Sequence, residues 1–202
     1  MVQGKLLLKA LLAWYVLFWI GMSFAPVDGQ NWILSSILPC LLVAFLVATH
    51  RAFPFSHRSY ALITLFLTLH MIGAHYTYAQ VPFGQWLESA FEMSRNPFDR
   101  IVHFCFGLLL TYPLLEVFVR LANAGAALAS YLSFMTPLGL SSLWEVLESW
   151  VARLVSPQLG DAYLGSQGDI WDAQKDMAAA VLGSLLCLLV LAAARSLRRQ
   201  TV

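Results

Sequence analysis

Charged residues are scarce in this sequence, and their scarcity excludes an ordinary soluble domain. Only 11% of the 202 residues are charged, whereas 59% are hydrophobic and 13% are aromatic. Soluble globular chains carry roughly 25% charged residues. The formal net charge of +1 gives no electrostatic reason to expect a nucleic-acid partner. The composition therefore predicts a chain embedded in a bilayer, with membrane lipids as its surroundings.

Cysteine and familiar catalytic motifs are also scarce or missing. Cys40, Cys105 and Cys187 each lie within an apolar stretch, and an odd number cannot pair fully within one chain. Buried free cysteine usually behaves as a small hydrophobe. The sequence has no H-E-x-x-H, paired C-x-x-C, G-x-S-x-G or glycine-rich phosphate loop. None of these motifs assigns an activity, so whether the protein is an enzyme stays open.

Long apolar runs fill most of the chain. Six spans of about 20 residues would use about 120 positions and leave too few for a separate soluble domain. The expected spans are 6–25, 32–49, 59–79, 101–121, 122–150 and 177–194. Pro26 would block signal-peptide cleavage after the first run, which is expected to remain as a helix. We therefore expect an all-α fold: residues 1–202 form one integral membrane domain, a polytopic bundle of six transmembrane helices.

Basic residues set the expected orientation of the bundle. Cytoplasmic loops carry an excess of Lys and Arg, and this excess predicts that both termini are cytoplasmic. The expected inner side holds eight basic residues: Lys5, Lys9, Arg51, Arg58, Arg120, Arg195, Arg198 and Arg199. The outer side holds Arg95, Arg100, Arg153 and Lys175, together with all the acidic residues except Glu116.

Ionisable residues near the outer ends of the spans are the candidate functional residues. Charge inside a bilayer is costly, so each such group needs a partner or a function. The candidates are His70, His75, Asp99, Arg100, His103, Glu145, Glu148, Asp169, Asp172, Lys175 and Asp176. Asp169, Asp172 and Asp176 lie on one face of a helix if that helix starts near Gly168. Carboxylates or imidazole on three helices at one depth favour a shared polar cavity, with His70 below them.

This set of side chains fits more than one kind of chemistry. Imidazole and carboxylate groups are ligands of divalent metals. The same groups suit acid–base chemistry in a low-dielectric pocket. The candidate metal ligands are His103, Glu145, Asp169, Asp172 and Asp176.

Each candidate also has a plain structural interpretation. Asp169 is a good N-cap residue, and Asp99 can fix the tautomer of His103. Arg100 or Lys175 can hold the carboxylates in closed ion pairs.

Two features away from this cluster are expected to be structural. Glu116 lies four residues before Arg120, a spacing that favours an ion pair within one helix. Ala179 and Gly183 give the last span a small face for close helix packing.

Four segments resemble the YjdF-type family of bacterial inner-membrane proteins: 70–78, 96–104, 144–148 and 161–177. The resemblance covers most of the chain. It implies a multi-pass protein of the bacterial inner membrane and does not imply an activity.

The order of polar residues along the last three spans also resembles, more distantly, that of VanZ-like membrane proteins, which are linked to low-level glycopeptide resistance. The residues that match this order are Arg100 and His103, then Glu145 or Glu148, then Asp169, Asp172 and Asp176. The chain departs from that pattern with Asp176, where asparagine is typical, with two added N-terminal spans and with the His70/His75 segment. The likeness implies only that the last three spans carry one site.

Three functions remain open from the sequence. The first is an outward-facing His/Asp/Glu pocket that binds or acts on a lipid-linked or envelope substrate, with a divalent metal ion as cofactor. The second is a structural or partner-binding membrane protein whose carboxylates are held in salt bridges; no protein partner can be identified. The third is a small carrier or channel, favoured by Pro39, Pro113 and Pro137 within the spans, although no internal repeat supports it.

Overall fold

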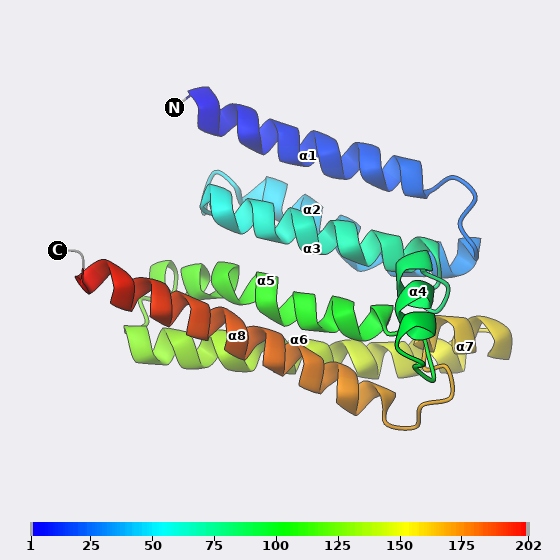
Figure 1. The fold of residues 1–202 in the computed structure, drawn as a ribbon. Helices are drawn as coiled ribbons and strands as arrows, with labels where there is room; N and C mark the ends of the chain where they lie inside the picture. The colour runs from blue at the N-terminus through cyan, green and yellow to red at the C-terminus, as the bar shows by residue number, and fades with distance from the viewer. Residues whose placement is uncertain (1, 201–202) are drawn as a thin grey trace.

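The computed structural model describes the backbone of residues 2–200 and the side chains of residues 4–197, so the expected inner-side residues Arg198 and Arg199 lie outside the described side chains. The described residues form only helices, in agreement with the expected all-α fold (Figure 1). The helices are α1 (Val2–Met22), α2 (Gly29–Thr49), α3 (His57–His75), α4 (Pro82–Ala90), α5 (Phe98–Arg120), α6 (Ala126–Leu154), α7 (Pro157–Leu164) and α8 (Asp172–Gln200).

Five helices among the described residues are long and apolar enough to cross a membrane. They contain Gly4–Met22, Gly29–Thr49, Phe98–Arg120, Ala126–Leu154 and Asp172–Leu197. Helix α3 is not among them, and His70 and His75 are two of its polar residues. It nevertheless packs against α1, α2 and α5 and runs beside them in Figure 1. The chain is therefore a multi-pass membrane protein, and a sixth span at α3 stays a prediction.

Residues with positive φ lie where α3 ends and shortly before α6 begins, so both helices have other bounds than the expected spans. Helix α3 stops at His75, before the expected end at residue 79, and Thr77 and Tyr78 both have φ of 54°. The expected helix start at residue 122 moves to Ala126, after Asn123 with φ of 51°. Such φ values interrupt right-handed helices.

The expected placement of three aspartates on one helix face is wrong for a similar reason. Helix α8 begins at Asp172 rather than near Gly168, whose φ is 83°. Asp169 therefore lies in the loop before the helix and cannot share a helical face with Asp172 and Asp176.

Helix α5 lies at the centre, in contact with α3, α6 and α8. It approaches α8 closely at Gly107 and Gly183: a Cβ atom on Gly107 would collide with the Ala180 carbonyl oxygen, and one on Gly183 with the Phe104 carbonyl oxygen. Small residues permit such close packing of membrane helices. The expected small face of α8 therefore lies against α5 at Gly183 and also includes Ala180, which is fully buried, whereas Ala179 is partly exposed.

The two short helices α4 and α7 lie at one end of the bundle, which we call the loop end (Figure 1). The start of α1 and the end of α8 both lie at the opposite end of the bundle (Figure 1). Helix α4 exposes Phe83 and Trp86, whose rings stack with a centroid separation of 5.8 Å. The loop end also carries the candidate polar residues, since it holds the starts of α5 and α8 and the end of α6.

Candidate functional site

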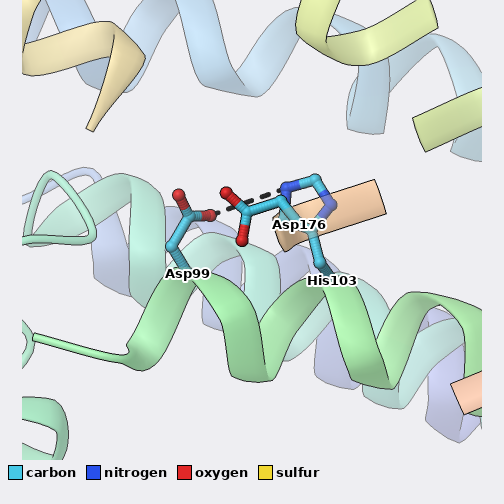
Figure 2. Close-up of side chains that lie close together, drawn as sticks. All are labelled: Asp99, His103 and Asp176. Carbon is cyan, nitrogen blue, oxygen red and sulfur yellow. Dashed lines mark ion pairs between the residues drawn. The ribbon is translucent and has the colours of Figure 1, made fainter. Parts of the chain in front are cut away.

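Helices α5 and α8 bring Asp99, His103 and Asp176 together at the loop end. Asp99 and His103 are one turn apart on α5, and their Oδ1 and Nε2 atoms are 3.7 Å apart. One ligand atom from each of the three side chains lies within 4.8 Å of the other two, and Figure 2 shows them converging. Ligand atoms around one tetrahedral Zn²⁺ at about 2.1 Å would lie about 3.4 Å apart. Small side-chain movements would therefore let all three bind one cation.

Helix α6 adds two more groups around His103. The Glu145 Oε1 atom is 3.5 Å from His103 Nε2, and the Ser141 hydroxyl is 3.1 Å from His103 Nδ1. When Nδ1–H donates to Ser141, Nε2 keeps a lone pair that faces the carboxylates. This is the tautomer in which Nε2 binds a metal, and a hydrogen bond at the other ring nitrogen is the usual way to fix it.

Two carboxylate oxygens in this cluster are buried without a hydrogen-bond partner. They are Asp176 Oδ1 and Glu145 Oε1, and the Asp176 residue is only 2% exposed. Glu148, one turn further along α6, lies close enough to Asp99, Glu145 and Asp176 to interact with them electrostatically. Burying like charges together is unfavourable. Arg95 lies within electrostatic reach of Asp99 and Asp176 and offsets part of this repulsion; a bound cation or bound protons would offset the rest.

The other two candidate aspartates are held by basic side chains. The Arg95 guanidinium donates to Asp172 and also to the carbonyl oxygens of Gly165 and Ser166, at 3.2 and 3.1 Å. Arg100 forms an ion pair with Asp169, and its Nη2 atom lies 3.5 Å from Asp172 Oδ1. The expected closed ion pairs are therefore present here, and these two carboxylates are not positioned with His103.

Asp169 has a second cationic partner. Lys175 Nζ donates to its Oδ2 atom at 2.7 Å, and the Trp171 amide donates to Oδ1 at 3.1 Å. The hydrogen bonds from Lys175 and Trp171, with a further one from Arg100, lower the pKa of Asp169 to about 2. Asp169 is therefore a carboxylate that fixes the loop before α8.

With this geometry established, comparison with known proteins gives the family. Residues 7–197 match a family of predicted membrane proteins, DUF2238. The chain belongs to the DUF2238 family. It is also 36% identical over 194 residues to the inner membrane protein YjdF of Escherichia coli (strain K12), which covers 95% of this chain and 91% of that protein. No solved structure matches it significantly.

These matches confirm the resemblance to the YjdF-type family. They do not bear on the likeness to VanZ-like proteins, which stays a prediction. The DUF2238 match extends over all the candidate site residues, from His70 to Asp176.

Of the two candidate histidines on α3 of this DUF2238 protein, only His70 faces the site. Its Nε2 atom is 2.9 Å from the Ser35 carbonyl oxygen, so Nε2 carries the proton and Nδ1 accepts from the Tyr78 hydroxyl at 2.6 Å. His70 lines the same cavity as Asp99 and His103. His75 instead contacts the Met22 carbonyl oxygen through Nδ1, at 2.9 Å. The structure therefore does not bring His75 to the cluster.

Sequence reasoning missed Arg95 and Asn96 as organising residues of the loop end. Asn96 is fully buried, and its amide donates to the carbonyl oxygens of Ala79 and Val81, both at 3.1 Å. Its backbone N–H donates to Gln167 at 3.0 Å. Asn96 thus connects the start of α5 to the segment before α4 and to the loop before α8. In the sequence, these two residues are marked only by the run Arg95-Asn96-Pro97 shortly before Asp99.

Tyr163 of α7 is another residue that sequence reasoning missed. Burial raises its pKa to about 12, and the nearby charge of Glu148 contributes. The phenol is therefore protonated at neutral pH and lies within electrostatic reach of Glu148.

Glu116, the acidic residue expected to pair within one helix, lies near the opposite end of α5. It forms the expected ion pair with Arg120 and accepts from the Ser59 hydroxyl at 2.6 Å and the Ser56 amide at 2.9 Å. Between Glu116 and the loop end, Thr111 hydrogen-bonds Ser184 of α8 at 2.8 Å. Thr111 is therefore part of the contact between α5 and α8, which gives little support to a polar path through the protein.

Proposed function

We propose that this protein binds a divalent cation through Asp99, His103 and Asp176, with Glu145 as a fourth ligand. The cation would hold the headgroup of a lipid-linked or envelope substrate. The observation that carries the proposal is the buried, unpartnered Asp176 Oδ1 atom in a cluster with His103 and Asp99. Carboxylate ligands suit Mn²⁺ and imidazole suits Zn²⁺, so these two ions are the ones to test.

We further propose that the loop end faces the outer side of the bacterial inner membrane. The similar Escherichia coli protein is an inner membrane protein. Lys5, Lys9, Arg51, Arg58 and Arg120 belong to helix ends or loops opposite the loop end. An excess of basic residues in short loops is typical of the cytoplasmic side. In this orientation the site receives its substrate from the outer leaflet or the envelope.

Metal analysis of the purified protein tests the cation site. The wild-type protein should retain about one equivalent of Mn²⁺ or Zn²⁺ after removal of free ions. Asp176→Asn and His103→Ala should each weaken binding by at least about 100-fold, because each loses a direct ligand, whereas loss of an outer-shell partner already costs about 10–100-fold. Glu116→Gln is the matched control, since this carboxylate lies near the other end of α5 and should leave the metal content unchanged.

The outcome that overturns the proposal is a wild-type protein that elutes as a folded species and holds neither ion stoichiometrically. Equal metal content in wild type and Asp176→Asn would overturn the assigned ligand set.

A structural role is the second candidate, favoured by the ion pairs of Arg95 with Asp172 and of Arg100 with Asp169. It predicts that Asp172→Asn lowers the amount of folded protein while the metal content per folded molecule is unchanged. Under the cation-binding proposal, in contrast, Asp169 and Asp172 fix the loops while Asp99, Glu145 and Asp176 form the binding site.

A further inference from the structure

A cavity of about 630 Å³ extends along α5 from the candidate cation site. The residues of α5 that line it recur on one face of the helix: Asp99, Val102, His103, Phe106, Leu110, Pro113, Leu114 and Val117. From Asp99 to Val117 the helix rises about 27 Å, which is close to the hydrocarbon thickness of about 30 Å of a bilayer. The cavity is therefore a long groove, and we call it the α5 groove.

The walls of the α5 groove are apolar and partly open to the bilayer. Helix α3 contributes Ile63 and Leu67 to the lining, α2 contributes six residues between positions 38 and 46, and α6 contributes five between positions 140 and 147. Helix α2 packs on α3, whereas α6 packs on α5 and α8. Leu41 of α2 and Leu143 of α6 line the groove and are 60% and 52% exposed. A hydrocarbon chain could therefore enter sideways, between α2 and α6.

The dimensions of the α5 groove fit one chain. Its volume divided by its length gives a cross-section of about 23 Å², which is enough for one extended hydrocarbon chain. Its polar lining is concentrated at the loop end, where His70, Tyr78, Asp99, His103 and Ser141 lie. An occupant of matching chemistry has one long apolar tail and a polar head.

The groups around the polar end indicate an anionic head. Arg95 and Arg100 both lie close enough to Asp99 to interact electrostatically. The Nε atom of each is a buried donor without an acceptor, and Arg95 is only 4% exposed. Together with the proposed cation, these two Nε donors match the acceptor oxygens of a phosphate group.

We infer that the α5 groove binds the hydrocarbon chain of a single-chain lipid phosphate, whose phosphate reaches the cation between Asp99, His103 and Asp176. The binding of the phosphate headgroup, which we call the headgroup half of the inference, rests on the proposed function because it requires the bound cation. The binding of the hydrocarbon chain rests only on the shape and lining of the groove. Acyl and prenyl phosphates share this chemistry, so both are used as probes.

Photolabelling tests the inference with the full-length protein in phosphatidylcholine nanodiscs containing Mn²⁺. The probe is an oleoyl lysophosphatidic acid that carries a diazirine in the middle of its chain. We expect labels on groove residues such as Phe106, Leu110 and Leu114, identified by mass spectrometry of the peptides. Excess unlabelled oleoyl lysophosphatidic acid or farnesyl phosphate should abolish the labelling, and whichever competes better identifies the chain type. The same chain ending in an alcohol should label at least about tenfold less.

Two tryptophan variants provide a matched comparison. Leu114→Trp fills the groove and should reduce labelling at least about tenfold without changing the metal content. Leu189→Trp places the same side chain at an exposed position of α8 outside the groove lining and should label like wild type. Size-exclusion chromatography checks that both variants fold.

The possible failures can be told apart. Equal labelling of Leu114→Trp and Leu189→Trp, or labels outside the groove, would overturn the inference while a bound metal leaves the proposed function intact. Groove labelling by a protein that holds no metal would overturn the proposed function and the headgroup half together. Equal labelling by the phosphate and alcohol probes would overturn the phosphate specificity alone.

Discussion

The Arg95 guanidinium and the Asp172 carboxylate form a buried ion pair that connects the end of one long loop to the first turn of α8. Both residues are more than 90% buried, with exposures of 4% and 8%. The same guanidinium also donates to Gly165 and Ser166 in the loop before α8. The pair therefore fixes the position of α8, and with it the position of Asp176 relative to α5.

Breaking this ion pair from one side should destabilise the protein. Removing one partner of a buried pair leaves an uncompensated charge, which costs about 3–5 kcal/mol. We expect Asp172→Asn and Arg95→Met each to lower the free energy of unfolding by about this amount, measured by denaturant titration in detergent. The double variant Arg95→Met/Asp172→Asn should lose less than the sum of the two single changes. Additive losses would show that the two side chains are not coupled.

The close contact between α5 and α8 should not tolerate larger side chains. Gly107→Leu would push a side chain into the backbone of Ala180, and overpacking typically costs about 1–3 kcal/mol. Gly139→Leu is the control, since a Cβ there would have no atom within 4 Å. Thermal unfolding in detergent should show a lower midpoint for Gly107→Leu only. An equal loss in both variants would argue against this packing.

The loop before α8 should lose order in acid. The folded-state pKa of Asp169 is about 2, below its ordinary value of 3.8. The stabilisation by Lys175, Trp171 and Arg100 is therefore fully present above pH 3.8 and is lost as the pH falls toward 2. Hydrogen exchange of the peptide containing Trp171, corrected for intrinsic rates, should rise across this range. In Asp169→Asn the exchange should already be fast at pH 5 and should change little on acidification.

Tyr78 should position His70 through the hydrogen bond between its hydroxyl and Nδ1. Tyr78→Phe leaves a buried acceptor unpaired, at a cost of about 1–3 kcal/mol. The ¹⁵N chemical shifts of the His70 ring report the tautomer, which in wild type should have the proton on Nε2. We expect a mixture of tautomers in Tyr78→Phe. An unchanged spectrum would show that the Ser35 carbonyl alone fixes the ring.

The sequence by itself determined the membrane class, the helical fold and the family. These follow from local properties: long apolar runs must satisfy their backbone hydrogen bonds internally, so they form helices in lipid. The Glu116–Arg120 pair was also predictable, because residues four apart lie on one face of a helix. In contrast, the start of α8 depends on the left-handed Gly168 and could not be read from the spacing of the aspartates.

Only the tertiary structure decided which acidic residues share a site. Asp169 and Asp172 look equivalent to Asp176 in the sequence, yet Arg100 and Arg95 pair with the first two and leave Asp176 Oδ1 without a partner. The contact between α5 and α8 through Gly107 and Gly183 sets this difference, because it places Asp176 beside His103. Such contacts join residues about 70 positions apart, and a charge pattern along one chain does not specify which cation reaches which carboxylate.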